Sequence, residues 1–425
     1  MFIYTVKSGD TLTALSSRFS IPVSRIVADN ALNYPNNLVV GQHLIIMSDS
    51  IRHVIEEGQT LFSLAQEFEI PLDDLLAANP NVNPIALRIG EVIIIPVPDN
   101  TPRRPAIING YAYPYITDNT LNCSLPFLTF LSPFSYSITT DGDIVPPSPS
   151  DARIVDRALN SSVMPLMVVT NINEGSFSTE ALSQVLASPY ARENLISSIL
   201  AELAEKGYHG VNLDMEYISP NDKDAYNAFL LELSDRLHNN GYILVTAVAP
   251  KLRADQPGLL YESHDYKVQG QAADYVIIMT YEWGYTYSAQ MSVQPINEVR
   301  KVLLYAVTEI PSQKILMGMP NYGYDWILPY VRGTAASSIG FTSALNLALY
   351  YHSEILFDEN SQTPYFYYTF NGTRHVVWFD DAKSIDAKLR LIDEFDLAGA
   401  SYWTINRCFI PNWEIVQNLF EIVKI

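Results

Sequence analysis

The sequence has little that would favour several common classes of protein. Its 425 residues include only two cysteines, Cys123 and Cys408, which is too few for a disulfide framework or a cysteine-based metal site. Only 17% of the residues are charged, and 26 Lys and Arg face 46 Asp and Glu. The formal net charge of −20 argues against a nucleic-acid partner, which needs a basic face, and against a basic patch for anionic lipid.

Several motifs are also missing. The seven histidines show no metal-ligand spacing, and there is neither a glycine-rich phosphate loop nor a Gly-x-Ser-x-Gly elbow. We therefore expect no metal and no cofactor. No apolar run reaches the roughly 18 residues of a membrane span, so we expect no membrane insertion. The chain enters patterned sequence directly at Met1, and we expect no signal peptide.

The most informative run is Gly-Val-Asn-Leu-Asp-Met-Glu at residues 210–216. In a β-strand, Asn212, Asp214 and Glu216 share one face. Each carboxylate opposes ionisation of the other, so one acid stands beside one carboxylate near neutral pH, the pairing that cleaves glycosidic bonds. An ordinary half-buried strand shows the same alternation. Helical periodicity on both sides instead indicates a βαβ unit, in which three polar residues on one face favour a barrel mouth.

The region after residue 105 repeats a short apolar strand followed by a helical stretch. The predicted strands are 106–111, 128–133, 166–170, 210–216, 243–249, 275–281, 315–320 and 399–404. Eight such strands predict an α/β fold, a (β/α)₈ TIM barrel with its active site at the carboxyl ends of the strands. Asn371-Gly372 predicts a hairpin within an insertion at about 327–385. Barrel closure could bring Cys123 to Cys408, although free thiols are the favoured interpretation.

An internal repeat fills the first hundred residues. Gly9 aligns with Gly58, and Gly41 with Gly90, at the same offset. Each unit reads strand, glycine turn, helix, Ile-Pro break, helix, Asn loop and strand, which predicts a βααβ module too small for an enzyme pocket. The predicted bounds are 1–48 and 51–97 for the modules, 98–105 for a stiff exposed linker, and 106–425 for the barrel.

Both repeats resemble LysM domains, which bind N-acetylglucosamine polymers. The resemblance implies that the loop after the first strand and the loop before the last strand hold the glycan. The implied contacts are Gly9, Asp10, Thr11 and Asn30 in the first module, and Gly58, Gln59, Thr60 and Asn79 in the second. A purely structural cap on the barrel is the alternative.

The 210–216 run resembles the signature D-G-x-D-x-D-x-E of family 18 glycoside hydrolases. Gly210, Asp214 and Glu216 match, whereas His209 and Asn212 replace two aspartates. The resemblance implies that Glu216 donates the proton and that Asp214 assists it. Because an amide at position 212 carries no charge, Asp214 must be kept in its working state by other neighbours.

The resemblance also implies that the insertion at about 327–385 is a small α+β unit. Further segments resemble the same family. Met279-Thr280-Tyr281-Glu282 is similar to its Met-x-Tyr-Asp segment, and 317–323 to its Gly-x-Pro-x-Tyr-Gly strand. The resemblance implies that Tyr281 binds the acetamido oxygen of the substrate. It also implies that Trp403 forms the floor of the site that holds the reactive sugar. Asn212, Glu282 and Tyr322 are the remaining implied substrate contacts. The implied mechanism is retaining and substrate-assisted, with the acetamido group as nucleophile.

Two LysM units before such a barrel resemble the spore cortex-lytic enzymes of endospore-forming bacteria. The resemblance implies an N-acetylglucosaminidase that acts on cortex peptidoglycan. It also implies a spore coat or cortex location after synthesis in the mother-cell cytoplasm. The alternatives are a chitinase-type hydrolase of N-acetylglucosamine polymers, a lectin-like barrel that binds glycan without cutting it, and a structural coat protein. Retention of Glu216 disfavours the lectin.

Overall fold

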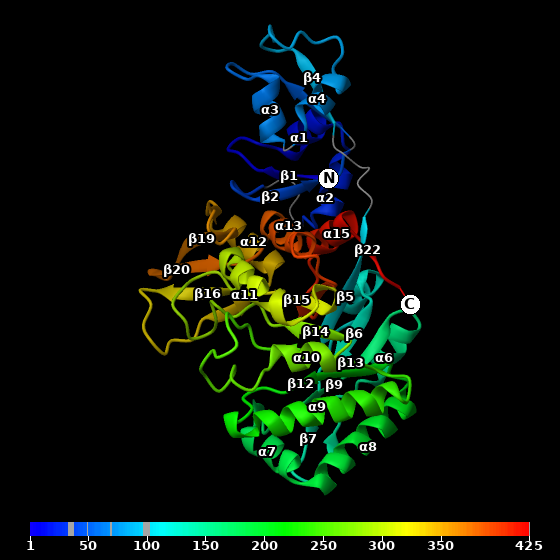
Figure 1. The fold of residues 1–425 in the computed structure, drawn as a ribbon. Coiled ribbons are helices and arrows are strands. Elements are labelled where there is room, and N and C mark those ends of the chain that lie inside the picture. The colour runs from blue at the N-terminus through cyan, green and yellow to red at the C-terminus, as the bar shows by residue number, and fades with distance from the viewer. Residues whose placement is uncertain (33–37, 49, 69, 97–102, 425) are drawn as a thin grey trace.

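Two small modules lie one above the other at the N-terminal end of the chain, and a large barrel domain follows (Figure 1). The structure, a computed structural model, describes residues 1–32, 38–48, 50–68, 70–96 and 103–424. Most of the predicted linker, residues 98–102, lies outside the described residues, as does residue 97 at the end of the second predicted module. Its last two positions, Arg104 and Pro105, belong to the first barrel strand.

Each N-terminal module has the predicted βααβ order. The first consists of β1 (Phe2–Thr5), α1 (Leu12–Phe19), α2 (Val23–Asp29) and β2 (His43–Ile46). The second consists of β3 (Ser50–Val54), α3 (Leu61–Glu67), α4 (Leu72–Ala78) and β4 (Val92–Pro96). The two strands of each module pair antiparallel, and apolar residues of both modules join one buried cluster.

Eight parallel strands close into the predicted barrel. They are β5 (Arg104–Ala112), β6 (Phe130–Pro133), β9 (Met164–Thr170), β12 (Gly210–Asp214), β13 (Ile243–Val248), β14 (Tyr275–Ile278), β15 (Ile315–Pro320) and β21 (Gly399–Trp403). Each pairs with the next, and β21 returns to β5 to complete the ring. All eight predicted strands are present, so the predicted fold is confirmed.

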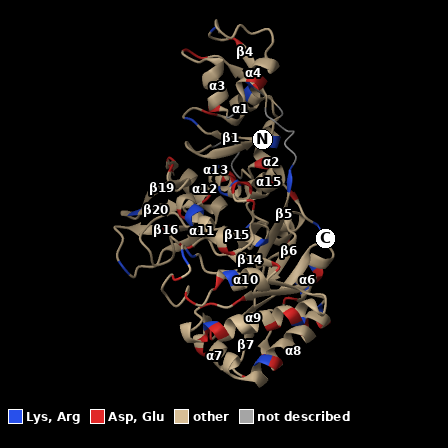
Figure 2. Ribbon diagram, viewed as in Figure 1, with Lys and Arg blue, Asp and Glu red and all other residues tan. Residues whose placement is uncertain are grey.

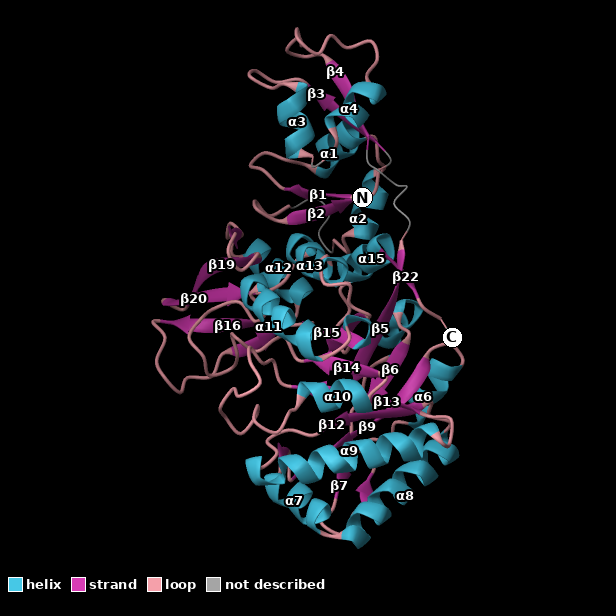
Figure 3. Ribbon diagram, viewed as in Figure 1, coloured by secondary structure: helices cyan, strands magenta, loops and turns pink. Residues whose placement is uncertain are grey.

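Helices surround the strands of the barrel (Figure 3). The longer ones are α6 (Ala152–Leu159), α7 (Thr179–Ala187), α8 (Pro189–Lys206), α9 (Lys223–His238), α11 (Ile296–Glu309), α13 (Ala382–Leu389) and α15 (Ile410–Leu419). Local sequence sets the ends of α8, because the Ser188 hydroxyl accepts from the Ala191 N–H and Gly207 closes the helix at φ 72°. The short helices α5 (Asp118–Ser124), α10 (Tyr266–Ala272) and α14 (Leu391–Glu394) complete this layer.

The alternation along β12 places its residues in two buried layers. Val211 and Leu213 pack in the apolar shell between strands and helices. Asn212 and Asp214 are buried on the opposite face, toward the barrel interior. The strand ends at Asp214, so Glu216, which we expected within it, lies two residues beyond its end.

A small α+β unit lies between β15 and β21. Its sheet has the order β17 (Ser337–Ile339), β16 (Gly323–Leu328), β20 (Thr373–Trp378), β19 (Thr363–Phe370) and β18 (Leu356–Asp358), with α12 (Phe341–Tyr350) beside it. The sheet begins at Gly323, four residues before the predicted insertion. Asn371 and Gly372 both have positive φ between β19 and β20, as the predicted hairpin requires.

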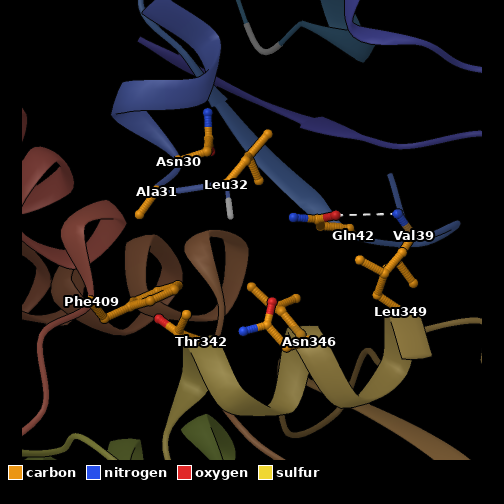
Figure 4. Close-up of a pocket in the computed structure, with 10 residues that line it drawn as sticks. Asn30, Ala31, Leu32, Val39, Gln42, Thr342, Asn346, Leu349 and Phe409 are labelled. Atoms are coloured by element: carbon orange, nitrogen blue, oxygen red, sulfur yellow. Dashed lines mark hydrogen bonds between the residues drawn. The ribbon is translucent and has the colours of Figure 1, made fainter. Parts of the chain in front are cut away.

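The first module packs directly against the barrel domain. The Ile355 N–H donates to the Val40 carbonyl (2.9 Å), and His43 Nδ1 lies 2.5 Å from Asp381 Oδ2 with both side chains buried. Val39, Gln42, Asn346 and Phe409 line a pocket at this junction (Figure 4). The first module is therefore a fixed part of the barrel body.

Cys123 and Cys408 form a disulfide, with their Cα atoms 6.0 Å apart. The interpretation as free thiols is therefore wrong. Cys123 lies in α5, after β5, and Cys408 follows β21. Because β21 pairs with β5, closure of the barrel brings together residues that are 285 positions apart in the sequence.

Candidate active site

The site lies where β12 ends at the carboxyl-terminal mouth of the barrel. Asp214 is the last residue of the strand and is buried, and Glu216 follows in a partly exposed position. Burial raises the pKa of both carboxyl groups, and the charge of Asp214 raises the pKa of Glu216 further. Near neutral pH the pair therefore holds a proton, which general acid catalysis requires.

One oxygen of the Asp214 carboxyl group, Oδ1, is buried without a hydrogen-bond partner among the residues that the structure describes. Buried polar atoms without partners are rare in folded proteins because each costs desolvation free energy. An unpartnered acceptor at the mouth of a barrel fits a ligand that brings its own N–H or O–H donor. This orphaned oxygen makes the mouth of the barrel a candidate position for a substrate.

Asn212 does not contact Asp214 through a hydrogen bond. Its amide oxygen accepts from the Tyr111 hydroxyl (3.0 Å), and its Nδ2 donates to the Ser132 hydroxyl (3.1 Å). The network continues from Ser132 to Asn109 (2.8 Å) and from Asn109 to Ser401 (2.8 Å). Asn212 therefore ties four strands of the barrel together beneath the site.

Aromatic side chains form one wall of the site. The Trp403 ring lies 4.8 Å from the Phe134 ring and 5.3 Å from the Tyr111 ring, edge to face in both cases. Trp403 ends β21, Tyr111 belongs to β5 and Phe134 follows β6. The three rings therefore come from neighbouring strands and leave Trp403 partly exposed at the mouth.

Tyr281 lies near both acids, and the other predicted contacts lie together beside it. Burial raises the pKa of Tyr281, and so do the charges of Asp214 and Glu216, so its phenol keeps the proton that a donor needs. The Tyr281 ring lies against β15, where a Cβ on Gly318 would meet it at 2.8 Å. Glu282 accepts hydrogen bonds from Tyr322 and from Tyr324, the second at 3.2 Å.

Two residues that no sequence motif indicated, Asn171 and His264, hold the backbone around Glu216. The Glu216 N–H donates to Asn171 Oδ1 (3.0 Å), and Asn171 Nδ2 donates back to the Glu216 carbonyl (2.8 Å). His264 contacts the residue before Glu216, since its Nε2 lies 2.9 Å from the Met215 carbonyl oxygen. The only sequence signal for Asn171 is a polar residue directly after an apolar strand.

The following carbonyls of this turn also accept from side chains. Thr179 donates its hydroxyl hydrogen to the Tyr217 carbonyl (2.6 Å). The Ser263 hydroxyl lies 3.2 Å from the Ile218 carbonyl and 3.0 Å from the next one. Side chains thus replace the missing strand neighbours along residues 215–219.

In the N-terminal modules, several predicted glycan contacts have a structural partner. Asn30 donates to the Ile45 carbonyl (2.8 Å) and accepts from its N–H (2.6 Å), and Asn79 makes the matching pair with Ile94. Both asparagines are buried. They therefore fasten the last strand of each module, and their side-chain amides are already in use.

The predicted residues after the first strand form similar turns in both modules. Asp10 accepts from the Tyr4 hydroxyl (2.8 Å), and Gln59 lies 2.8 Å from His53. Thr11 and Thr60 cap α1 and α3 by accepting backbone N–H groups. Gly9 and Gly58 have φ near 88° and 83°, with open space where a Cβ would stand.

Charge is dispersed over the described part of the molecule. Figure 2 shows Lys and Arg close to Asp and Glu on α8 and α9. Arg236, for example, pairs with Glu193 at 2.8 Å. Within the described residues, no helix is long and apolar enough to cross a membrane.

Comparisons with known proteins agree with this geometry. The family model "Glycosyl hydrolases family 18" matches residues 156–407, and the LysM domain model matches residues 4–46 and 53–96. A curated relative, the cortical fragment-lytic enzyme of Bacillus subtilis, is 42% identical over 100% of this chain and 99% of its own length.

Solved structures give the same result. The crystal structure of the spore cortex-lytic enzyme SleL of Bacillus cereus is 36% identical, with a TM-score of 0.88 over 100% of this chain and 98% of that one. The corresponding structure from Bacillus megaterium has a TM-score of 0.87 over 99% and 98%. The chain belongs to the family 18 glycosyl hydrolases and carries two LysM domains. It is therefore a glycosidase.

Proposed function

We propose that the protein hydrolyses spore cortex peptidoglycan after N-acetylglucosamine by a retaining, substrate-assisted mechanism. The carrying observation is the buried, unpartnered Oδ1 of Asp214 beside Glu216. Full-length similarity to proteins named for lysis of the cortex supports the substrate and a spore location. Synthesis in the mother cell and deposition in the coat or cortex complete the proposal.

In this mechanism Glu216 protonates the leaving glycosidic oxygen. The acetamido oxygen of the same sugar attacks the anomeric carbon and forms an oxazolinium ion. Asp214 Oδ1 accepts the acetamido N–H and balances the positive charge, while the Tyr281 hydroxyl donates to the acetamido oxygen. Glu216 then takes a proton from water, which attacks the same carbon and retains the β configuration.

Replacement of the acid tests this proposal. Glu216→Gln keeps the shape but delivers no proton, so turnover of purified cortex fragments should fall by about 10²–10⁴-fold. Glu205→Gln, an exposed position on α8, is the matched control and should keep full turnover. Wild-type turnover in Glu216→Gln would reject the assignment of the acid, and an initial α-anomer in the wild-type product would reject retention.

We further propose that the second LysM module provides most of the binding affinity for insoluble glycan. Its loop before the last strand carries Ile85 and Ile89, which are 92% and 71% exposed. In the first module, Leu32, Val39 and Gln42 face α12 across the pocket in Figure 4. Because Asn79 is committed to backbone bonds, a glycan would contact residues around it, including Gly58, Gln59 and Thr60.

A further inference from the structure

We propose that Asn171 is a positioning residue for the Glu216 carboxyl group, assisted by His264. This inference rests on the proposed function, because it concerns the same acid. Asn171 is completely buried and stands directly after β9, and the register pairs its neighbour Thr170 with Asp214 at the end of β12. The parallel pairing therefore brings the Asn171 amide beside the first residues beyond the strand.

The contacts of Asn171 are specific to an amide. Its oxygen accepts the Glu216 N–H, and its Nδ2 donates to the Glu216 carbonyl, so both peptide groups that flank one Cα are fixed by one side chain. The Asn side chain carries its donor and its acceptor on the same carbon, in one rigid plane, so one amide can reach both groups. Asn171 Nδ2 also donates to the Ser178 carbonyl (3.0 Å), which fixes the amide itself.

His264 holds the residue between the two acids. Its Nδ1 accepts from the Ala249 N–H (2.9 Å), so its Nε2 carries the hydrogen and donates to the Met215 carbonyl (2.9 Å). Beyond Asp214 the strand ladder no longer restrains the chain, and Tyr217 adopts a φ of 53°. Asn171 and His264 supply the restraint on either side of Met215.

Such restraint matters because the acid must reach the glycosidic oxygen within hydrogen-bond distance. A misplacement of about 1 Å can cost about 100-fold in rate. The side-chain hydrogen bonds of Asn171 and His264 among the described residues go to backbone groups and do not involve the carboxyl groups of Asp214 or Glu216. Their loss should therefore reduce kcat with little effect on KM, since substrate contacts remain in place.

The test compares two asparagines that are two positions apart. Asn171→Ala should lower kcat on soluble cortex fragments by about 100-fold with KM nearly unchanged. Asn173→Ala, an exposed position in the β10 strand (Ile172–Asn173), should match the wild type. Circular dichroism and melting temperature establish that each variant is folded before kinetics are compared.

A second variant decides the matter if Asn171→Ala does not fold. Asn171→Asp keeps the acceptor and the size but loses both donors when ionised, so kcat should fall near pH 7 and recover partly at lower pH as the introduced carboxyl group gains a proton. Wild-type kcat in a folded variant, or loss confined to KM, would overturn the inference. If Glu216→Gln is inactive in the same assay, the proposed function survives that outcome.

Discussion

Acidification should destabilise the protein through one buried histidine. His264 is completely buried, with Nδ1 bonded to a backbone N–H and Nε2 to a backbone carbonyl. A second ring proton would point at the Ala249 N–H. The pKa of His264 falls from 6.5 to about 4, chiefly because of burial, and the ammonium group of Lys251, which donates to the His264 carbonyl (3.0 Å), contributes to this lowering.

The magnitude follows from linkage. The unfolded chain binds a proton at this histidine below pH 6.5, whereas the folded chain does so only below about pH 4. The contribution of neutral His264 to the free energy of unfolding is therefore fully present above pH 6.5 and is lost as the pH falls through 4. At about 1.4 kcal/mol per pH unit, His264 should cost the folded state about 3 kcal/mol by pH 4.

Urea unfolding at several pH values between 7 and 4 measures this loss. Between pH 7 and pH 4, the free energy of unfolding should fall by about 3 kcal/mol more for the wild type than for His264→Gln. The glutamine amide can still donate to the Met215 carbonyl but does not titrate. Asp214 and Glu216 titrate in both proteins, so the difference isolates the histidine. The exposed His352→Gln variant should follow the wild type. Parallel curves for wild type and His264→Gln would refute the reasoning.

Two further predictions use the repeat as its own control. Gly41→Ala and Gly90→Ala both strain a backbone of positive φ, but a Cβ on Gly41 would stand 1.9 Å from the Ile355 carbonyl oxygen and one on Gly90 meets nothing. Gly41→Ala should therefore lower the melting temperature clearly more than Gly90→Ala. Equal shifts would contradict the packing of the first module against the barrel domain. Ile89→Glu should weaken co-sedimentation with insoluble cortex and leave turnover of soluble fragments unchanged. Undiminished co-sedimentation would show that this loop does not contribute to glycan binding.

The sequence predicted the architecture because its signals are local. Apolar runs marked all eight barrel strands, and Asn371-Gly372 marked the hairpin. Strand ends were less certain, since Tyr281 and Glu216 lie beyond the strands in which we expected them. Periodicity continues past the last ladder bond, so it does not show where backbone pairing stops.

Contacts between distant segments could not be predicted in this way. Cys123 and Cys408 required a closed barrel before their distance could be judged, and two cysteines alone favoured free thiols. Asn171 contacts Glu216 across 45 positions, and no local pattern distinguishes it from the exposed Asn173. The repeat likewise did not predict that the first module packs on the barrel domain, where Val39 and Gln42 line a pocket with α12.

The replacement of an aspartate by Asn212 gains a physical meaning from these contacts. The oxygen of the Asn212 amide accepts from Tyr111 and its Nδ2 donates to Ser132, and an amide offers Asp214 neither a charge nor a titratable proton. Glu216 is then the carboxyl neighbour with which Asp214 shares its titration, and burial raises the pKa of both groups. An Asn212→Asp change would bury a third carboxyl group against Tyr111 without a cation, so the barrel is suited to two acids and a neutral amide.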